Sequence, residues 1–283
     1  MPEILFSEAE WDAAMPRVVA EMSDYLKPYR TPLLVDAGDH AVGGGTGSYL
    51  ELGGRTFILT NAHVAAIREG TRRLVHQLAG VENFANVIGD HSKFEYPLDL
   101  ALLPVDTRAW DGLSHGSRAI SLDQIAWAHS PVPTELMTFV GFPGDDVGFH
   151  FDSVTLKAKC LTGREVLLPP EDDRFSPRFH FGLDYKPDLA VDVIAKEGLS
   201  RPPGLSGSTV WNTCFVEAKM AGTPWTPELA KVTGVVWGWP SNVGCLVATR
   251  AEYLRSFLLD LLQRETAMAG RSGTLPPASE PSD

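Results

Sequence analysis

From Leu33 onward the sequence consists of short apolar segments separated by glycine-containing turns, a pattern that argues against a helical protein. The clearest case is the pair of segments 48–52 and 55–60, which are joined by Gly53-Gly54. Two consecutive glycines between strand-like segments indicate a tight β-hairpin, because glycine readily adopts the positive φ angles of such turns. Further candidate strands lie at 136–141, 154–161, 165–168, 179–183, 189–193, 209–212, 232–237 and 245–249. We therefore expect a mainly β fold.

Helical periodicity is found at the two ends of the chain. Ser7 and Glu10 have the spacing of a capping box, and apolar residues then recur at helical intervals as far as Leu26. Near the other end, residues 250–264 form an amphipathic helical pattern, and residues 270–283 are rich in Gly, Ser and Pro, as in disordered tails. We expect the first helix to pack on the outside of the main domain; the alternative is a docking or regulatory arm.

Composition narrows the class of protein. The 283 residues carry a net charge of −12, which argues against nucleic acid or an anionic membrane surface as the main partner. No apolar run reaches membrane-spanning length, and the N-terminal segment lacks the pattern of a signal peptide. The three cysteines are widely spaced and form no metal-binding pattern, so they are expected to be free thiols in a reducing cytoplasm.

One stretch is suited to presenting a nucleophile: Arg201-Pro202-Pro203-Gly204-Leu205-Ser206-Gly207-Ser208. Consecutive prolines restrict the backbone, and glycines allow angles that place N–H groups beside a reacting carbonyl. Turns rich in Gly and Ser are also common in loops without catalytic function, so the stretch needs support from the rest of the chain. Ser206 is its candidate nucleophile, and we reject Ser208 because no glycine lies two residues before it.

A serine attacks efficiently only when a base takes its proton and an acid orients that base. His63 directly follows the predicted hairpin, and Asp99 lies in the apolar run 96–103, where a lone carboxylate needs a partner. The alternatives are a histidine without catalytic function and a solvated aspartate in a turn. If Ser206 is the nucleophile, the order His63, Asp99, Ser206 excludes an α/β-hydrolase, because every histidine of the chain precedes Ser206.

The segment "GTGSYLELGGRTFILTNAHV" (residues 45–64) resembles the histidine-bearing hairpin of chymotrypsin-like serine peptidases, and its wording is closest to the bacterial HtrA-type branch. The runs D-L-A-L-L at 99–103, G-F-P-G at 141–144 and G-V-V-W-G at 234–238 also resemble segments of this family. The remainder after Thr249 is too short for the PDZ-like domain of HtrA proteins.

The resemblance implies a trypsin-like fold of two six-stranded antiparallel β-barrels with an N-terminal and a C-terminal helix. It divides the chain into an N-terminal helix or arm (1–32), a first barrel with the crossover (33–133), a second barrel with the C-terminal helix (134–266) and a disordered tail (267–283). The implied activity is that of a serine endopeptidase without metal or organic cofactor. Its partners would be a protein or peptide substrate and an activating protein.

The resemblance also implies roles for particular residues. His63 is the catalytic base, Asp99 orients it, and Ser206 is the nucleophile. The backbone N–H groups of Gly204 and Ser206 form the oxyanion hole. Four residues are expected to line the substrate pocket and to favour an uncharged side chain before the scissile bond: Ser200, Trp237, Gly238 and Trp239.

One residue departs from the family pattern. Leu205 occupies the position at which secreted trypsins have an aspartate, which pairs with the N-terminus freed by activation. Leucine cannot form that ion pair, so we expect no activation by N-terminal cleavage. The N-terminal helix or the segment 217–231 could order the site instead. The competing hypothesis for the whole chain is a latent or inactive trypsin-like domain that acts as a protein-binding module.

Overall fold

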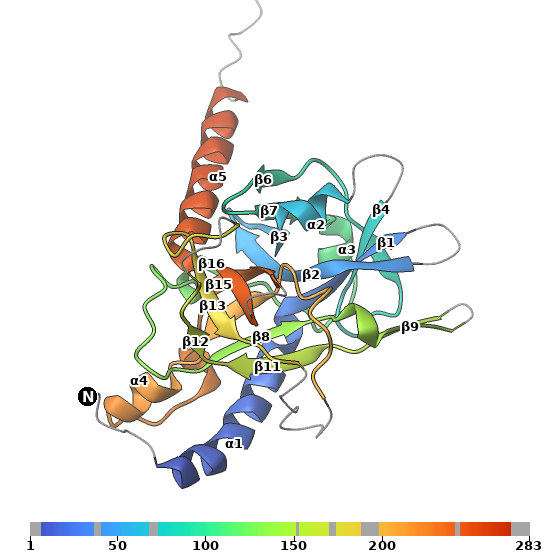
Figure 1. Ribbon diagram of the computed structural model, residues 1–283. Helices are drawn as coiled ribbons and strands as arrows, with labels where there is room; N and C mark the ends of the chain where they lie inside the picture. Colours follow the sequence, from blue (N-terminus) through green and yellow to red (C-terminus); the bar gives the residue numbers. More distant parts are fainter. Residues whose placement is uncertain are drawn as a thin grey trace, which may run out of the picture.

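The computed structural model of the chain describes residues 7–36, 41–67, 73–150, 153–169, 174–187, 198–240 and 244–272. Two curved antiparallel sheets form the body of the protein, and a long helix at each end of the chain extends away from them (Figure 1).

The first sheet has the strand order β5-β4-β1-β2-β3-β7-β6. Its strands are β1 (Arg30–Asp36), β2 (Ala41–Leu52), β3 (Arg55–Thr60), β4 (Arg73–Gln77), β5 (Phe84–Asn86), β6 (Ser92–Phe94) and β7 (Leu100–Pro104).

The second sheet has the order β11-β8-β14-β15-β16-β13-β12. Its strands are β8 (Met137–Gly141), β11 (Lys159–Gly163), β12 (Glu165–Val166), β13 (His180–Asp184), β14 (Thr209–Asn212), β15 (Lys231–Gly238) and β16 (Cys245–Arg250). A separate hairpin pairs β9 (Val147–His150) with β10 (Ser153–Leu156).

The helices are α1 (Glu8–Leu26), α2 (Ala62–Ala66), α3 (Thr107–Gly112), α4 (Phe215–Met220) and α5 (Ala251–Ser272). Short 3-10 turns are η1 (Lys27–Tyr29), η2 (Leu122–Gln124), η3 (Gly144–Asp146) and η4 (Pro227–Leu229).

The mainly β class, with two antiparallel half-barrels and terminal helices, is confirmed. Each sheet contains seven strands instead of the expected six, because short edge strands such as β12, with two residues, extend it. The predicted hairpin joins β2 to β3, and both Gly53 (φ 59°) and Gly54 (φ 75°) have positive φ angles. The candidate strand 189–193 lies outside the described residues.

Consecutive residues of the central strands alternate between two apolar cores. In β3, Ile58 packs inside the first barrel, while Phe57 and Leu59 join a core shared with the helices. In β14, Val210 packs inside the second barrel, while Trp211 joins the same shared core. Because side chains of a strand point alternately to its two faces, such strands carry apolar residues on both faces, and both cores fix their register.

The N-terminal helix is part of this packing. Its predicted capping box is present, since Ser7 N donates to Glu10 Oε2 (2.8 Å) and Glu10 N donates to Ser7 Oγ (3.3 Å). Val18, Met22 and Leu26 of α1 are buried in the shared core. The expectation of a helix packed against the main domain is therefore confirmed.

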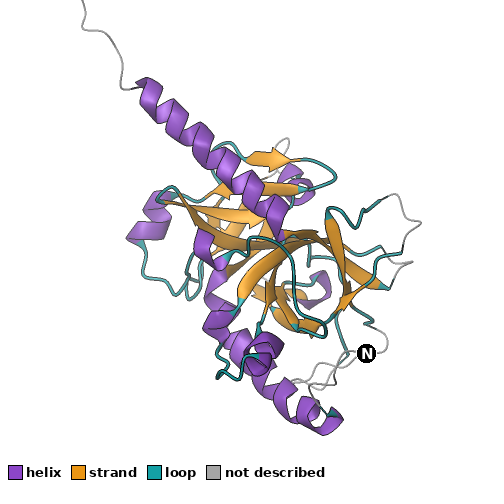
Figure 2. Cartoon of the chain, turned by 90° about the vertical axis from the view of Figure 1, so that its left-hand side faces the viewer, coloured by secondary structure: helices purple, strands orange, loops and turns teal. Residues whose placement is uncertain are grey.

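The C-terminal helix lies at the other end of the molecule from α1 (Figure 2). Leu254 and Phe257 are fully buried, and the Phe257 ring packs against Phe94 of the first sheet with centroids 4.8 Å apart. Helix α5 continues through residues 267–272, which were expected to belong to the tail. Good helix formers such as Glu265, Ala267 and Met268 extend it beyond the amphipathic pattern. Residues 273–283 lie outside the described part of the chain.

The first sheet contains a fully buried histidine. His76 of β4 is fully buried, and its Nδ1 lies 2.9 Å from the hydroxyl of Tyr49. That hydroxyl donates its hydrogen to the carbonyl of Gln77 (3.0 Å), so His76 Nδ1–H is the donor to Tyr49. Burial disfavours the charged imidazolium and lowers the pKa of His76 to about 4.

We expect this histidine to destabilise the protein at low pH. In the unfolded chain its pKa is about 6.5, so the unfolded state binds the proton first as the pH falls. The free energy of unfolding should decrease between pH 6.5 and pH 4, by about 3 kcal/mol from this group. Urea unfolding across this range should show a shallower pH dependence for His76→Gln. An unchanged slope in the variant would show that other groups cause the acid sensitivity.

Candidate active site

His63 is exposed on a short helix whose neighbouring side chains are buried. Helix α2 begins directly after β3, and Ala62 and Val64 are buried while the side chain of His63 is 52% exposed. His63 Nδ1 lies 2.5 Å from Asp99 Oδ2, and His63 N donates to Asp99 Oδ1 (2.9 Å). One carboxylate thus binds both the ring and the backbone of the histidine, which fixes the orientation of the imidazole.

Asp99 is held in an unusual backbone conformation. Its φ angle is 49°, in the left-handed region that only a few non-glycine residues adopt. Two backbone hydrogen bonds stabilise this conformation: Asn61 Nδ2 donates to Asp99 O (2.8 Å), and Asp99 N donates to Glu95 O (3.2 Å). Its side chain is 9% exposed, so the carboxylate faces His63 in a partly dry environment.

The second barrel also holds this loop. Thr249 Oγ1 donates to Leu98 O (2.8 Å), and His180 Nε2 lies 2.7 Å from Pro97 O. Because Ser176 N donates to His180 Nδ1 (3.0 Å), the hydrogen of the neutral ring is on Nε2 and is donated to Pro97. Burial lowers the pKa of His180, which favours this neutral form.

The loop before β14 presents Ser206, which is half-buried. Most backbone N–H groups around it donate to backbone carbonyls: Leu205 N to Pro202 O (2.9 Å), Gly207 N to Val236 O (3.0 Å) and Ser208 N to Leu205 O (3.1 Å). Gly204 and Gly207 have φ angles of 97° and 90°, which only glycine adopts without strain.

Two N–H groups of this loop differ from the rest. Among the described residues, the N–H groups of Gly204 and Ser206 have no acceptor. Pro203 O accepts from Gly144 N (2.8 Å), and in a planar trans peptide the N–H of Gly204 points the opposite way. By the same rule the N–H of Ser206 points away from Leu205 O, which accepts from Ser208. The loop therefore offers two N–H donors that no described acceptor occupies.

Strand β2 brings this loop next to the histidine. Thr46 N donates to Ser206 O (2.9 Å), and Thr46 O accepts from Thr60 Oγ1 (2.8 Å) three residues before His63. A Cβ added to Gly45 would lie 2.9 Å from Val64 and 3.2 Å from Ser206 O, so both pack on the same glycine. Within the described residues, however, Ser206 Oγ makes no hydrogen bond to His63.

Three of the four predicted pocket residues, Trp237, Gly238 and Trp239, lie at the end of β15. Trp237 and Gly238 directly follow Val236, whose carbonyl binds Gly207, and the Trp237 ring lies 5.7 Å from the His180 ring. Trp239 packs against the core of the second barrel. Ser200 is half-buried, and its carbonyl accepts from the hydroxyl of Tyr185 (2.5 Å).

Three residues of this site were not predicted from the sequence. Asn61 and Thr46 lie beside predicted residues, in the motifs T-N-x-H and G-T-G, so their positions were a usable signal. His180 has no such signal, because its partner Pro97 is 83 residues away in the chain.

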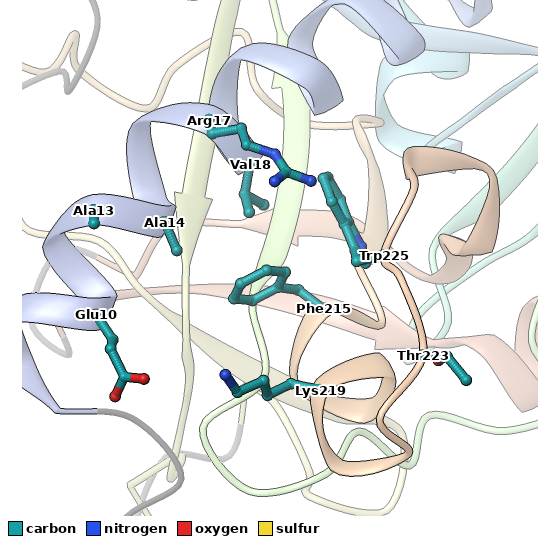
Figure 3. A pocket seen from close by; sticks show the side chains of 9 residues that line it. All are labelled: Glu10, Ala13, Ala14, Arg17, Val18, Phe215, Lys219, Thr223 and Trp225. Carbon is teal, nitrogen blue, oxygen red and sulfur yellow. The ribbon is translucent and has the colours of Figure 1, made fainter.

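An apolar hollow of about 410 Å³ lies elsewhere, between α1 and the segment from α4 to Trp225 (Figure 3). It is lined by Glu10, Ala13, Ala14, Arg17, Val18, Phe215, Lys219, Thr223 and Trp225. None of the predicted site residues lines it.

In the described part of the chain, no group of three or more His, Cys, Asp or Glu side chains is arranged to hold a metal ion.

Among the helices of the described residues, none has the length and apolar character that a membrane crossing needs.

No family model and no curated protein sequence matches the chain. Solved structures with the same fold do match. A serine endoprotease from Yersinia pestis superimposes with a TM-score of 0.51 at 13% identity, over 88% of this chain and 67% of the other. An inactivated protease paralogue of the scabies mite gives 0.52 at 15% identity, over 86% and 97%. The chain therefore has the trypsin-like two-barrel fold, which active and inactivated proteases share.

Gly207 provides a test of how closely the two barrels approach. A Cβ at this position would lie 2.1 Å from Thr46 O and 2.3 Å from Thr60 Oγ1, so Gly207→Ala must push the loop away from β2. We expect a loss of about 3 kcal/mol in the free energy of unfolding, from overpacking and positive-φ strain together.

The matched control is Gly222→Ala, which also has a positive φ (66°) but open space around the added Cβ. Urea unfolding should show a loss of about 1 kcal/mol for this control. Equal losses for the two variants would contradict the close approach of the loop to β2.

Proposed function

We propose that the chain is a serine endopeptidase that hydrolyses peptide bonds through an acyl-enzyme intermediate. Ser206 would be the nucleophile, His63 the base and Asp99 the residue that orients it. The observation that carries the proposal is the pair of bonds from Asp99 to His63, to the ring Nδ1 (2.5 Å) and to the backbone N (2.9 Å). This arrangement leaves Nε2 as the ring nitrogen available to a neighbouring hydroxyl.

In the proposed reaction, His63 Nε2 takes the proton of Ser206 Oγ as this oxygen attacks the peptide carbonyl. The carboxylate of Asp99 stabilises the imidazolium that forms. The same proton passes to the leaving amine when the C–N bond breaks. Water then attacks the acyl-enzyme ester: His63 takes a proton from this water and passes it to Ser206 Oγ as the ester bond breaks. In the proposed reaction, the hydrogen bond from Ser206 Oγ to His63 Nε2 would form when substrate binds.

The oxygen of the tetrahedral intermediate needs hydrogen-bond donors fixed in advance. Gly204 N and Ser206 N would fill this role, since neither donates to a described residue and both adjoin the nucleophile. Removal of one such donor typically costs about 3–4 kcal/mol of transition-state stabilisation.

Pocket specificity follows from the residues proposed to line it. Ser200, Trp237, Gly238 and Trp239 carry no charge. A carboxylate that could pair with Arg or Lys of a substrate is missing from this set, so we propose a preference for apolar or small side chains before the scissile bond. The substrate would be a dedicated protein of the cytoplasm, where three free cysteines are stable.

The nucleophile loop is anchored by apolar packing. Leu205 is fully buried in the core of the second barrel, in one cluster with Phe139 and Val236. We propose that this contact replaces the ion pair of trypsins, so that no cleavage of the N-terminus is needed and any control would come from an activating partner.

The second candidate is a latent or inactive domain that binds proteins. It is favoured by the missing hydrogen bond between Ser206 and His63, and the fold is compatible with it, since an inactivated protease has the same fold.

A fluorophosphonate probe separates the two candidates. We expect the wild-type chain to form a covalent adduct that Ser206→Ala abolishes, because the probe traps an activated serine. Asp99→Asn should slow labelling by about 10,000-fold. Ser208→Ala, a neighbouring serine whose buried hydroxyl has no described partner, is the matched control and should label. Absence of wild-type labelling, measured by mass spectrometry, would favour the binding module.

The role of Leu205 has a separate test. A chain whose N-terminus is blocked by a tag should react with the probe at the rate of a chain with a free α-amino group, because no ion pair to the N-terminus is needed. Labelling that appears only after proteolytic release of a new α-amino group would contradict this proposal.

A further inference from the structure

We propose that Thr46 is a positioning residue for the oxyanion hole, and that its side chain and backbone hold Gly204 and Ser206 in the orientation that catalysis needs. The inference rests on the proposed peptidase function. Thr46 would touch neither substrate nor the reacting atoms, and would act only through the nucleophile loop.

Thr46 contacts both residues that are proposed to form the oxyanion hole. Thr46 Oγ1 donates to Gly204 O (2.7 Å), and Thr46 N donates to Ser206 O (2.9 Å). Within residues 204–208, Gly204 and Ser206 are also the two residues whose N–H groups donate to no described residue. Each therefore has its carbonyl bound to one threonine of the first barrel and its N–H directed elsewhere.

The hydroxyl of Thr46 also accepts a hydrogen bond from the segment 142–144. Phe142 N donates to Thr46 Oγ1 (3.0 Å), and two residues later Gly144 N donates to Pro203 O (2.8 Å). The segment 142–144 thus binds the loop both directly and through the threonine. A hydroxyl can donate one hydrogen and accept another at the same time, which an apolar side chain of the same size cannot do.

The loop needs these hydrogen bonds because its backbone can adopt more than one conformation at Gly204. Gly204 has a φ angle of 97° and no side chain to restrict it. The Leu205 side chain fixes the loop on the side of the second core, and Leu205 N donates to Pro202 O (2.9 Å). The hydrogen bonds of Thr46 to Gly204 O and Ser206 O hold the peptide groups that directly follow the two proposed donors, so they oppose a rotation of the loop that would turn those donors away.

Thr46 is also coupled to the histidine. Its carbonyl accepts from Thr60 Oγ1 (2.8 Å), and Thr60 ends the strand that leads into α2 and His63. The side chain of Thr46 is fully buried, so its bonds do not compete with water. One residue therefore joins the strand that carries the base to the loop that carries the nucleophile.

The test compares fluorophosphonate inactivation of the wild type with Thr46→Val, which keeps the shape and removes the hydroxyl. In this reaction Ser206 Oγ forms a bond to phosphorus, fluoride leaves, His63 takes the proton, and the phosphoryl oxygen occupies the oxyanion hole. We expect the maximal inactivation rate to fall by about 10- to 100-fold, because donors are misaligned, with little change in the probe concentration for half-maximal rate. Thr46→Ser should restore the rate to within about 3-fold, since it restores the hydroxyl.

The matched control is Thr31→Val in β1. Thr31 is equally buried, and its hydroxyl also both donates and accepts: it lies within donating distance of Gln77 O (3.0 Å) and Pro32 O (3.2 Å) and accepts from Gln77 N (3.0 Å). This variant should lose similar thermal stability but keep the wild-type inactivation rate. If Thr46→Val does not fold, Thr46→Ala and Thr46→Ser form the comparison.

Equal rates for Thr46→Val, or its Ala substitute, and Thr31→Val would overturn the role of Thr46 and leave the peptidase proposal intact. Failure of the wild type to react would contradict the peptidase proposal itself, and the role of Thr46 with it.

Discussion

The arrangement of the candidate site depends on hydrogen bonds between β2 of the first barrel and the loop before β14 of the second. Thr46 N binds Ser206 O, Thr60 Oγ1 binds Thr46 O, and Gly207 packs so closely on both threonines that no side chain fits. These contacts join residues about 160 positions apart in sequence into one rigid unit. Without them, the loop that carries Ser206 would lose its direct hydrogen bonds to β2, the strand that pairs with the one leading to His63.

Burial of the Asp99 carboxylate is the second requirement. A buried charge is costly unless hydrogen bonds compensate it, and this carboxylate receives one from the backbone of His63 and contacts its ring. The loop that carries it is held from both barrels, by Asn61 on one side and by Thr249 and His180 on the other. The desolvation cost is thus met by an arrangement that also selects one tautomer of the imidazole.

Most strands of the second sheet, the β2–β3 hairpin and both terminal helices could be predicted from the sequence, because local periodicity and the glycine pair at 53–54 determine them. In the first sheet, β1 and β4 to β7 were not among the predicted strands. The proximity of His63 and Asp99 followed only from a motif resemblance, and the structure brings them into contact. The hydrogen bonds of His180 to the loop before Asp99 and of Thr46 to the nucleophile loop could not be predicted, because both depend on long-range packing of the two barrels. The helical extension to Ser272 was missed because amphipathic periodicity ends before helix propensity does.

In the proposed site, an activated Ser206 lies beside two N–H donors, Gly204 N and Ser206 N, that the fold holds in place. The most direct measurement is a crystal structure of the chain after reaction with a fluorophosphonate. Our account predicts phosphorus bonded to Ser206 Oγ and a phosphoryl oxygen about 2.7–3.1 Å from both Gly204 N and Ser206 N. A phosphoryl oxygen directed to solvent, or an adduct on another residue, would contradict it.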